Sequence, residues 1–441
     1  MQAETSPKPV LHVEVAIPAS HSFSTNSHLL TVQMQWANFF EHENPVLKVQ
    51  DHEGMVHPSC IPVDLAGFHV RVAFQDESRN LPDRLPTAEY DCHIHIFRLS
   101  EEETAIEEID DGGDNEWTAG CDSLPLPHKQ LEGLWESLIL EIGLKQRLLD
   151  YAQSALLFSD RAVSSHLVHW NRILLLHGLP GTGKTSLCRA LAHKLAIRMN
   201  HRFPGGATLL DVRAHSLFSK WFSTSGKLVS ALFQMVRDMV QDDPTALVCV
   251  LVDEVESLAS SRSSSHQGGG DPSDAMRAVN SLLTSLDKLR FFPNVLVLAT
   301  TNLTDSIDAA FVDRVDLKLH IDLPIVKARY EILRSCLVEL QRVGIVEPSN
   351  MTPLPFDQQA RESGGGHTSG TNQTRLLKCA EASQGLSGRS LRRLPLQAHA
   401  QFLGGRTIGV SLEMFLGALG MAIDEEQSSS AIMTRRSGGG R

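Results

Sequence analysis

The residues with the clearest capacity for chemistry form one glycine-rich segment, Gly178-Leu179-Pro180-Gly181-Thr182-Gly183-Lys184-Thr185. It fits the pattern G-x-x-x-x-G-K-[ST] between an apolar run and a helix-favouring stretch. Glycines let backbone N–H groups converge on phosphate oxygens, and a helix N-terminus adds partial positive charge. We expect Lys184 to reach the β- and γ-phosphates and the Thr185 hydroxyl to ligate Mg²⁺.

Two adjacent carboxylates, Asp253 and Glu254, end the apolar run 247–252. Carboxylates at the end of a buried strand are costly unless they act on a metal or a water. We expect Asp253 to hold Mg²⁺, directly or through its waters, and Glu254 to polarise the attacking water as general base. The alternative is a helix N-cap followed by a charge in the first turn, which the phosphate-binding segment upstream disfavours.

A side-chain amide, Asn302, follows another apolar run, 295–300. At the end of a buried strand it is placed to orient the same water toward the γ-phosphate. The alternative is an asparagine that begins a turn, which is common.

The elements that must position these residues follow a regular order. Short, unalternating apolar runs at 173–177, 208–212, 247–252 and 295–300 are separated by helical segments. Such runs are typical of a parallel sheet covered on both faces, so we predict an α/β fold. Residues 131–158 have helical periodicity, and residues 375–423 also indicate helices.

The first 100 residues have a different pattern. Runs at 11–17, 69–74 and 92–97 are β-rich, which predicts a small mixed α/β domain. The acidic run 101–116 is interpreted as a solvated linker, because like charges repel one another. His93 and His95 could bind a metal, but no third ligand is evident and we expect no site.

Composition excludes several classes of function. The 441 residues include 40 Lys and Arg against 52 Asp and Glu, a net charge of −12. This balance argues against nucleic-acid or anionic-membrane binding as the main task. No apolar run approaches the ~18 residues that span a bilayer, and no secretory signal is visible. Seven widely spaced cysteines without C-x-x-C favour free thiols in the cytosol or nucleus.

Residues 131–423 resemble the AAA+ ATPases, a resemblance that implies ATP as the nucleotide and a small α-helical lid after the ATPase sheet. Asn302 matches the sensor-1 position, and Arg314 in IDAAFVDRVD matches the arginine finger that completes a neighbouring subunit's site. That role implies a ring, usually a homohexamer. The usual pattern has a second arginine where this chain has Phe311. Arg389 in GLSGR resembles sensor 2. The alternative for either arginine is a solvated surface residue.

A segment at 219–227, SKWFSTSGK, resembles pore loop 1 of AAA+ unfoldases. The resemblance implies that Trp221 and Phe222 grip a translocating peptide, because flat rings intercalate between side chains without reading their sequence. The alternative is a pair of core aromatics, which the polar flanking residues disfavour. Severing enzymes have Gly-Glu where this chain has Ser223-Thr224, a difference that leaves the effect of Thr224 on substrate grip open.

Within AAA+ the chain resembles the pachytene checkpoint protein 2 family, also called the thyroid receptor-interacting protein 13 family. The stretches that carry the resemblance are 148–163, 170–195, 215–230, 251–262, 271–287, 311–318 and 385–395. The resemblance implies an ATP-driven enzyme that converts HORMA-domain proteins from the closed to the open state, with or without an adaptor. It implies roles in the spindle checkpoint and in meiotic chromosome-axis control. It also implies a nuclear and cytoplasmic protein that associates with chromosomes in meiosis.

The expected organisation has five parts. Residues 1–100 form a substrate- or adaptor-binding domain, and 101–130 an acidic linker. Residues 131–323 form the large ATPase subdomain, 324–424 the helical lid with a flexible insertion at 347–374, and 425–441 a flexible tail. Two other functions stay open. One is microtubule severing, which the pore-loop residues disfavour, and the other is a nucleotide-switched adaptor that does not translocate its partner.

Overall fold

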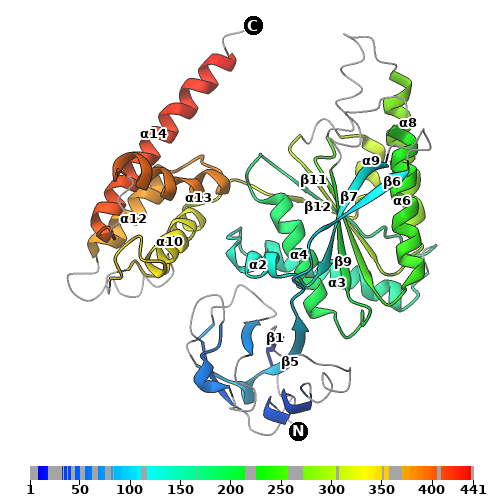
Figure 1. Ribbon diagram of the computed structural model, residues 1–441, viewed down its shortest axis with the longest axis horizontal. Coiled ribbons are helices and arrows are strands. Elements are labelled where there is room, and N and C mark those ends of the chain that lie inside the picture. Colours follow the sequence, from blue (N-terminus) through cyan, green and yellow to red (C-terminus); the bar gives the residue numbers. More distant parts are fainter. Residues whose placement is uncertain are drawn as a thin grey trace, which may run out of the picture. The chain divides into compact units, whose positions relative to one another are not determined.

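The four apolar runs form the centre of a seven-stranded sheet in the computed structural model (Figure 1). Its strand order is β12-β8-β11-β10-β9-β7-β6. The central strands β8, β11, β10 and β9 are parallel, as expected from their unalternating apolar residues. The strands are β6 (Ala105–Asp110), β7 (Trp117–Leu126), β8 (Ile173–His177), β9 (Ala207–Arg213), β10 (Leu247–Asp253), β11 (Val295–Thr301) and β12 (Leu317–His320).

The structure describes residues 8–17, 32, 34–36, 38–40, 45–49, 55–61, 68–74, 81–82, 84–110, 117–164, 166–213, 225–256, 272–303, 307–349, 352–356, 370–404 and 409–438. The chain forms two compact units. The first contains residues 1–137, 142–177 and 185–319, and the second contains 138–141, 178–184 and 320–441. This division differs from the expected one, because the N-terminal domain belongs with the ATPase sheet and the phosphate loop belongs with the C-terminal helices.

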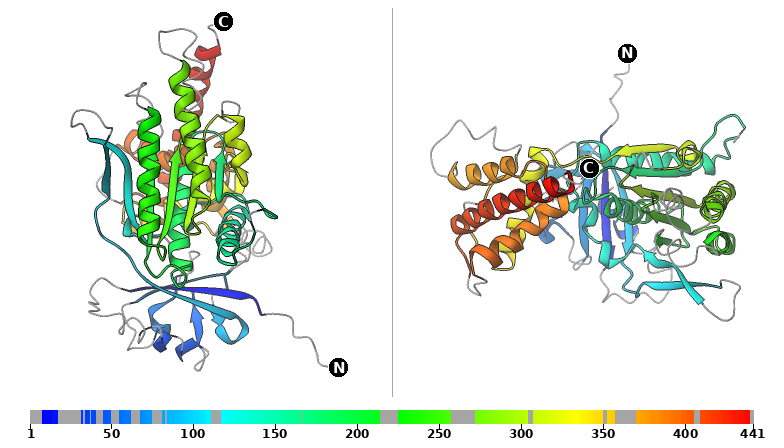
Figure 2. Two further views of the ribbon diagram at one scale, coloured as in Figure 1. Left: turned by 90° about the vertical axis from the view of Figure 1, so that its right-hand side faces the viewer. Right: turned by 90° about the horizontal axis from the view of Figure 1, so that it is seen from above.

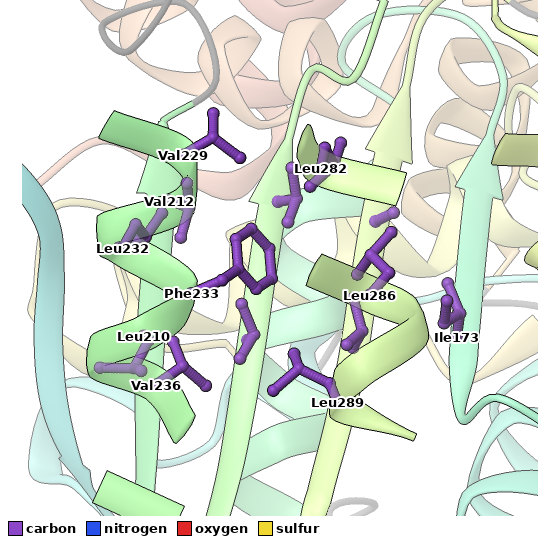
Figure 3. Packing of buried hydrophobic residues seen from close by; sticks show 14 of the residues in the cluster. Ile173, Leu210, Val212, Val229, Leu232, Phe233, Val236, Leu282, Leu286 and Leu289 are labelled. Carbon is purple, nitrogen blue, oxygen red and sulfur yellow. The ribbon is translucent and has the colours of Figure 1, made fainter. Parts of the chain in front are cut away.

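Two long helices, α6 (Ser225–Asp242) and α8 (Pro272–Leu289), pack side by side on one face of the sheet (Figure 2). Figure 3 shows Phe233 of α6 and Leu286 of α8 inserted among strand residues such as Val212. Every residue of β11 is buried, so the opposite face of the sheet is covered as well. This packing fixes the strand ends that carry the candidate site.

The prediction of a linker at 101–130 is wrong for residues 105–110 and 117–126, which form strands of the sheet. Residues of β7 pair antiparallel with β9, and β6 forms the edge of the sheet beside β7. Leu124 and Leu126 are buried in this arrangement. The carboxylate of Glu107 lies on the edge strand, where charged side chains discourage pairing with another chain. A high density of acidic residues in the sequence is therefore compatible with an edge strand as well as with a loop.

The predicted helical region 131–158 is interrupted. It contains a 3₁₀ turn, η4 (Lys129–Leu131), then α2 (Leu134–Ser137) and α3 (Leu144–Asp160). Gly143 precedes α3 with φ 81°, a left-handed conformation that glycine adopts without steric cost. The first unit also contains α4 (Lys184–Arg198), which begins at the end of the phosphate loop, and α9 (Ala309–Arg314).

The N-terminal domain is built on a three-stranded sheet of order β3-β1-β5, which confirms the three predicted strands. Alternation along β1 places Leu11, Val13 and Val15 in an apolar core with Trp36. The elements are β1 (Val10–Ile17), β2 (Val46–Lys48), η1 (Pro58–Cys60), β3 (His69–Phe74), β4 (Arg84–Pro86), η3 (Thr87–Glu89) and β5 (Asp91–Arg98). The intervening residues of β1, including Glu14, are buried on the opposite face.

A buried network of charges joins this second face to α4. Glu14 lies 2.8 Å from the Nζ of Lys194 and 3.2 Å from the Nε of Arg198. Lys194 also lies 2.8 Å from Glu136, which pairs with Arg71 at 3.2 Å. Burial alone raises the pKa of Glu14, but Lys194 and Arg198 outweigh it and hold that pKa well below its usual range. The network ties the N-terminal domain to the helix that follows the phosphate loop.

Two histidines, His12 and His95, lie beside the network. His12 and His95 are within hydrogen-bond distance, at 3.0 Å between Nδ1 and Nε2. Burial, then His12, lowers the pKa of His95 to about 3. Among the described residues no three His, Cys, Asp or Glu side chains are grouped as metal ligands. His95 is buried and stacks on the ring of His12.

The second unit contains a bundle of helices, as expected for a lid. They are α10 (Val326–Arg342), α12 (Gly370–Ala382), α13 (Gly388–Gln397), the π-helical turn η6 (Ala398–Phe402) and α14 (Leu412–Gly438). Tyr330, Leu391 and Phe415 lie in its core, each no more than 1% exposed. No helix in the described part of the chain is both long and apolar enough to span a bilayer.

Two expected loops are partly helical. The predicted tail begins inside α14, which continues to Gly438 because no proline or glycine interrupts residues 421–437. Glu426 on α14 accepts a hydrogen bond from Arg393 of α13 at 2.6 Å. The end of the predicted 347–374 insertion forms the first turn of α12, and residues 357–369 lie outside the described residues.

The cysteines match the prediction of free thiols. All seven lie in the described ranges and are free, and Cys188 and Cys249 are buried as core residues.

Replacing Lys194 should destabilise the first unit. Lys194→Met leaves the carboxylates of Glu14 and Glu136 buried with one cation fewer, which costs about 3–5 kcal/mol of unfolding free energy. Urea unfolding monitored by tryptophan fluorescence measures the loss. Lys129→Met is the matched control, because its pair with Glu101 is exposed to solvent and its removal leaves no charge buried without a partner. Equal effects of the two changes would contradict the assigned role of the network.

Candidate functional site

In the first unit, Asp253 lies at the end of β10 between two hydroxyl donors. Thr185, in the first turn of α4, donates from Oγ1 to Oδ1 of Asp253 at 2.8 Å. Thr300 of β11 donates to the same oxygen. The sequence motifs predicted that Thr185 and Asp253 act together, and the structure brings them together. A hydroxyl and a carboxylate are the hard oxygen ligands that Mg²⁺ prefers, so these residues fit that ion.

The chain turns sharply after Asp253. Glu254 has φ 56°, a left-handed conformation that is unfavourable for a non-glycine residue by about 1–3 kcal/mol. Its backbone N–H donates to Oγ1 of Thr300 at 3.2 Å, and the N–H of Val255 donates to the carbonyl of Thr300 at 3.0 Å. Val255 is buried, whereas Glu254 is exposed. The turn therefore leaves the carboxylate of Glu254 accessible to water, as a general base requires.

Asn302 follows β11 and is held by a second carboxylate. Its backbone N–H and its Nδ2 both donate to Oε1 of Glu256, at 3.1 and 3.0 Å. Asn302 is among the residues that the sequence motifs predict, whereas Glu256 and Thr300 are not. Glu256 lies two residues after Glu254, and this repeated acidic spacing was the available signal.

Arg314 lies at the end of α9. Asp287 of α8 accepts two hydrogen bonds from its guanidinium, from Nε at 2.8 Å and from Nη2 at 2.9 Å. This pairing raises the pKa of Arg314. The side chain of Arg314 is 28% exposed, so it is neither buried nor an unpaired surface residue. Phe311, at the position of the second arginine in the usual pattern, is buried in the ATPase core and anchors α9.

The phosphate loop belongs to the second unit. The Nζ of Lys184 donates to the carbonyls of Gly178 and Leu179 at 2.8 Å each. Gly178 has φ 145°, and a Cβ there would lie 2.2 Å from the carbonyl oxygen of Ile321. Only glycine fits this position, because the clash would be with backbone. Leu179 and Pro180 are exposed at the loop surface, and Thr182 Oγ1 donates to Leu179 at 2.9 Å.

The loop also packs on the start of α13. The backbone N–H of Arg389 donates to the carbonyl of Gly181 at 3.1 Å. A Cβ on Gly181 would lie 2.7 Å from Oγ of Ser387, which caps α13 by accepting from the N–H of Ser390. The side chain of Arg389 is exposed. The sensor-2 candidate and the phosphate loop are therefore joined through their backbones.

The predicted pore-loop residues are not placed. Trp221, Phe222 and Thr224 lie outside the described residues, which resume at Ser225 where α6 begins. Their assignment stays a prediction.

Comparisons with known proteins identify the family. Residues 174–323 match the ATPase family associated with various cellular activities, and 325–427 match the TRIP13-like AAA+ ATPase lid C-terminal domain. The chain is 49% identical over 349 residues to a pachytene checkpoint protein 2 homolog of Oryza sativa subsp. indica, covering 76% of this chain and 72% of the relative. The chain belongs to the pachytene checkpoint protein 2 family. It is therefore an AAA+ ATPase that binds nucleotide.

A second relative and two solved structures are also similar to this chain. A homolog of Xenopus tropicalis is 44% identical over 357 residues, which covers 80% of this chain and 81% of the relative. The solved structure of C. elegans PCH-2 matches with a TM-score of 0.74 at 28% identity, covering 95% of this chain and all of that one. A chain of the E. coli MS115-1 HORMA:CdnC:Trip13 complex matches with a TM-score of 0.51 at 18% identity, covering 68% and 94%, and shows the fold alone.

Replacing Glu254 should separate nucleotide binding from hydrolysis. Glu254→Gln is expected to bind ATP normally but to hydrolyse it about 10²–10⁴-fold more slowly, because the general base is lost. Fluorescent-nucleotide titration and phosphate release measure the two steps. Glu103→Gln, an exposed carboxamide substitution before β6, is the matched control. Normal turnover by Glu254→Gln would remove the general-base assignment.

Proposed function

We propose that this ATPase converts HORMA-domain proteins from the closed, partner-bound state to the open state, directly or through an adaptor. The observation that carries the proposal is the TRIP13-like lid at residues 325–427 joined to an ATPase sheet. Support also comes from the bacterial complex of similar fold, whose description names a HORMA protein together with Trip13. The names of the relatives support a role at the pachytene checkpoint.

Hydrolysis rests on the residues at the ends of β10 and β11. Glu254 takes the proton of the attacking water, and Asn302 orients that water. Lys184 neutralises charge on the phosphates, with Arg389 as a second cation. Thr185 and Asp253 would hold Mg²⁺, which would supply further positive charge to the phosphates. The water oxygen bonds to the γ-phosphorus while the bond to the β,γ-bridging oxygen breaks and ADP leaves. The cations stabilise the negative charge on the transferring phosphoryl group and on ADP.

The working assembly in this proposal is a ring homohexamer in which Arg314 acts on the neighbouring subunit's nucleotide. Asp287 holds the Nε edge of the guanidinium and one of its terminal nitrogens. The finger is thus held in one orientation at the surface of its own subunit. A single finger is expected, since Phe311 is committed to the core.

Mixed subunits test this assembly. Lys184→Ala removes phosphate binding, and Arg314→Ala removes the finger, so each variant alone should have little ATPase activity. Mixing them should restore activity, because an Arg314→Ala subunit keeps its own phosphate loop and receives the finger of a Lys184→Ala neighbour. Adding wild-type chain to Lys184→Ala/Arg314→Ala double-variant subunits is the control. Absence of any recovery in the mixture would contradict action between subunits.

A substrate trap tests the proposed substrate. Glu254→Gln chain with ATP should retain a HORMA-domain protein that mass spectrometry identifies, and Trp221→Ala in the same chain should release it. Trp221→Ala alone should keep basal ATPase activity while remodelling is lost. Tubulin in the trap would support severing instead. ATP-dependent partner binding with very slow turnover by the wild type would support a switched adaptor.

The proposal includes the cellular setting. We propose activity in the nucleus and cytoplasm, with association with chromosomes in meiosis and a role in the spindle checkpoint. No direct contact with nucleic acid or membrane is part of this function.

A further inference from the structure

A single carboxylate oxygen holds Asn302 at two points. Oε1 of Glu256 accepts the backbone N–H of Asn302 at 3.1 Å and its Nδ2 at 3.0 Å. The second oxygen, Oε2, is buried and has no hydrogen-bond partner among the described residues. Among the described residues, the hydrogen bonds of this carboxylate are therefore made to Asn302.

This arrangement decides which way the amide of Asn302 points. The two ends of an asparagine amide have nearly the same shape, and hydrogen bonding decides between the two orientations. An ionised carboxylate only accepts hydrogen bonds, so it selects the NH₂ end and turns Oδ1 away from Glu256. Because the backbone of Asn302 bonds to the same oxygen, the side chain is also fixed relative to its own main chain.

Glu256 connects this amide to the candidate general base. The turn that contains Glu254 is held to β11 by Thr300, through the N–H groups of Glu254 and Val255. Val255 is anchored in the core with 2% exposure. The bond from Glu256 to Asn302 closes the same turn on the residue that leaves β11. The geometry thus couples the position of the Glu254 backbone to that of the Asn302 amide.

We propose that Glu256 is a positioning residue for ATP hydrolysis, which acts through Asn302 by presenting the Oδ1 of its amide toward the attacking water. Glu256 touches neither nucleotide nor water in this role. The inference rests on the proposed function of Asn302, and its test is designed to separate the two.

The test is a double-mutant cycle on Glu256 and Asn302. Glu256→Leu should lower kcat about as much as Asn302→Ala, on the order of 10–100-fold, with nucleotide affinity and KM nearly unchanged. The variant with both changes should be no slower than Asn302→Ala alone, because Glu256 has no other path to the reaction. Glu256→Gln should keep most of the activity, since its Oε1 can accept both hydrogen bonds.

A second carboxylate controls for a general loss of stability. Glu331 of the lid is also partly buried and accepts a backbone N–H, from Phe356, and a side-chain N–H, from Arg334. If Glu331→Leu lowers kcat, it should lower kcat by the same factor in the wild type and in the Asn302→Ala chain, because Glu331 does not act through Asn302. Glu256→Asp is the second variant at the site. It keeps the charge but shortens the side chain by one methylene, so it should lower kcat in a chain whose circular dichroism matches the wild type.

The outcomes are distinct. If Asn302→Ala lowers kcat and Glu256→Leu either leaves it unchanged or slows the double variant further, the positioning role is wrong while the role of Asn302 stands. If Asn302→Ala leaves kcat unchanged, the proposed role of Asn302 fails, and the inference about Glu256 fails with it. Both roles are supported if Glu256→Leu and Asn302→Ala each lower kcat and the double variant is no slower than Asn302→Ala alone. Glu256→Gln should then keep most of the activity.

Discussion

The carboxylate of Asp253 accepts hydrogen bonds from Thr185 at the start of α4 and from Thr300 at the end of β11. It therefore joins a helix and two strands at one point. Parallel strands end at the same edge of a sheet, so the register of β10 against β11 sets where Glu254 and Asn302 lie. A slip by one residue would turn the side chains of a strand to the other face of the sheet and displace the residues that follow it. The core between the sheet and helices α6 and α8 prevents that slip.

The N-terminal domain is attached to the ATPase by charge as much as by apolar packing. Its apolar side forms a core of its own, and its polar side meets Lys194 and Arg198 through Glu14. A buried network of this kind adds little net stability compared with an apolar contact, but any shift would leave a buried charge unpaired. The contact therefore favours one orientation of the domain on α4, the helix that begins at the phosphate loop.

Positive φ angles occur in the phosphate loop and in the turn that contains the candidate general base. Gly178 and Gly181 have positive φ in a loop where any Cβ would clash, so only glycine fits. Glu254 also has positive φ, although it is not a glycine, and four hydrogen bonds along the turn from Glu254 to Glu256 hold it there. The strain places a carboxylate at the surface while the residues on either side of it stay bonded to β11.

Local pattern in the sequence was enough to determine the central strands, the phosphate loop, the carboxylates after β10 and the family. Each of these depends on neighbouring residues, whose spacing is set by strand and helix geometry. The tertiary structure alone decided that Glu256 holds Asn302, that Asp287 holds Arg314 and that the acidic segment adds two strands to the sheet. In the sequence these carboxylates are indistinguishable from solvated charges. Their partners lie 46 and 27 residues away in the first two cases, and only the fold brings them within hydrogen-bond distance.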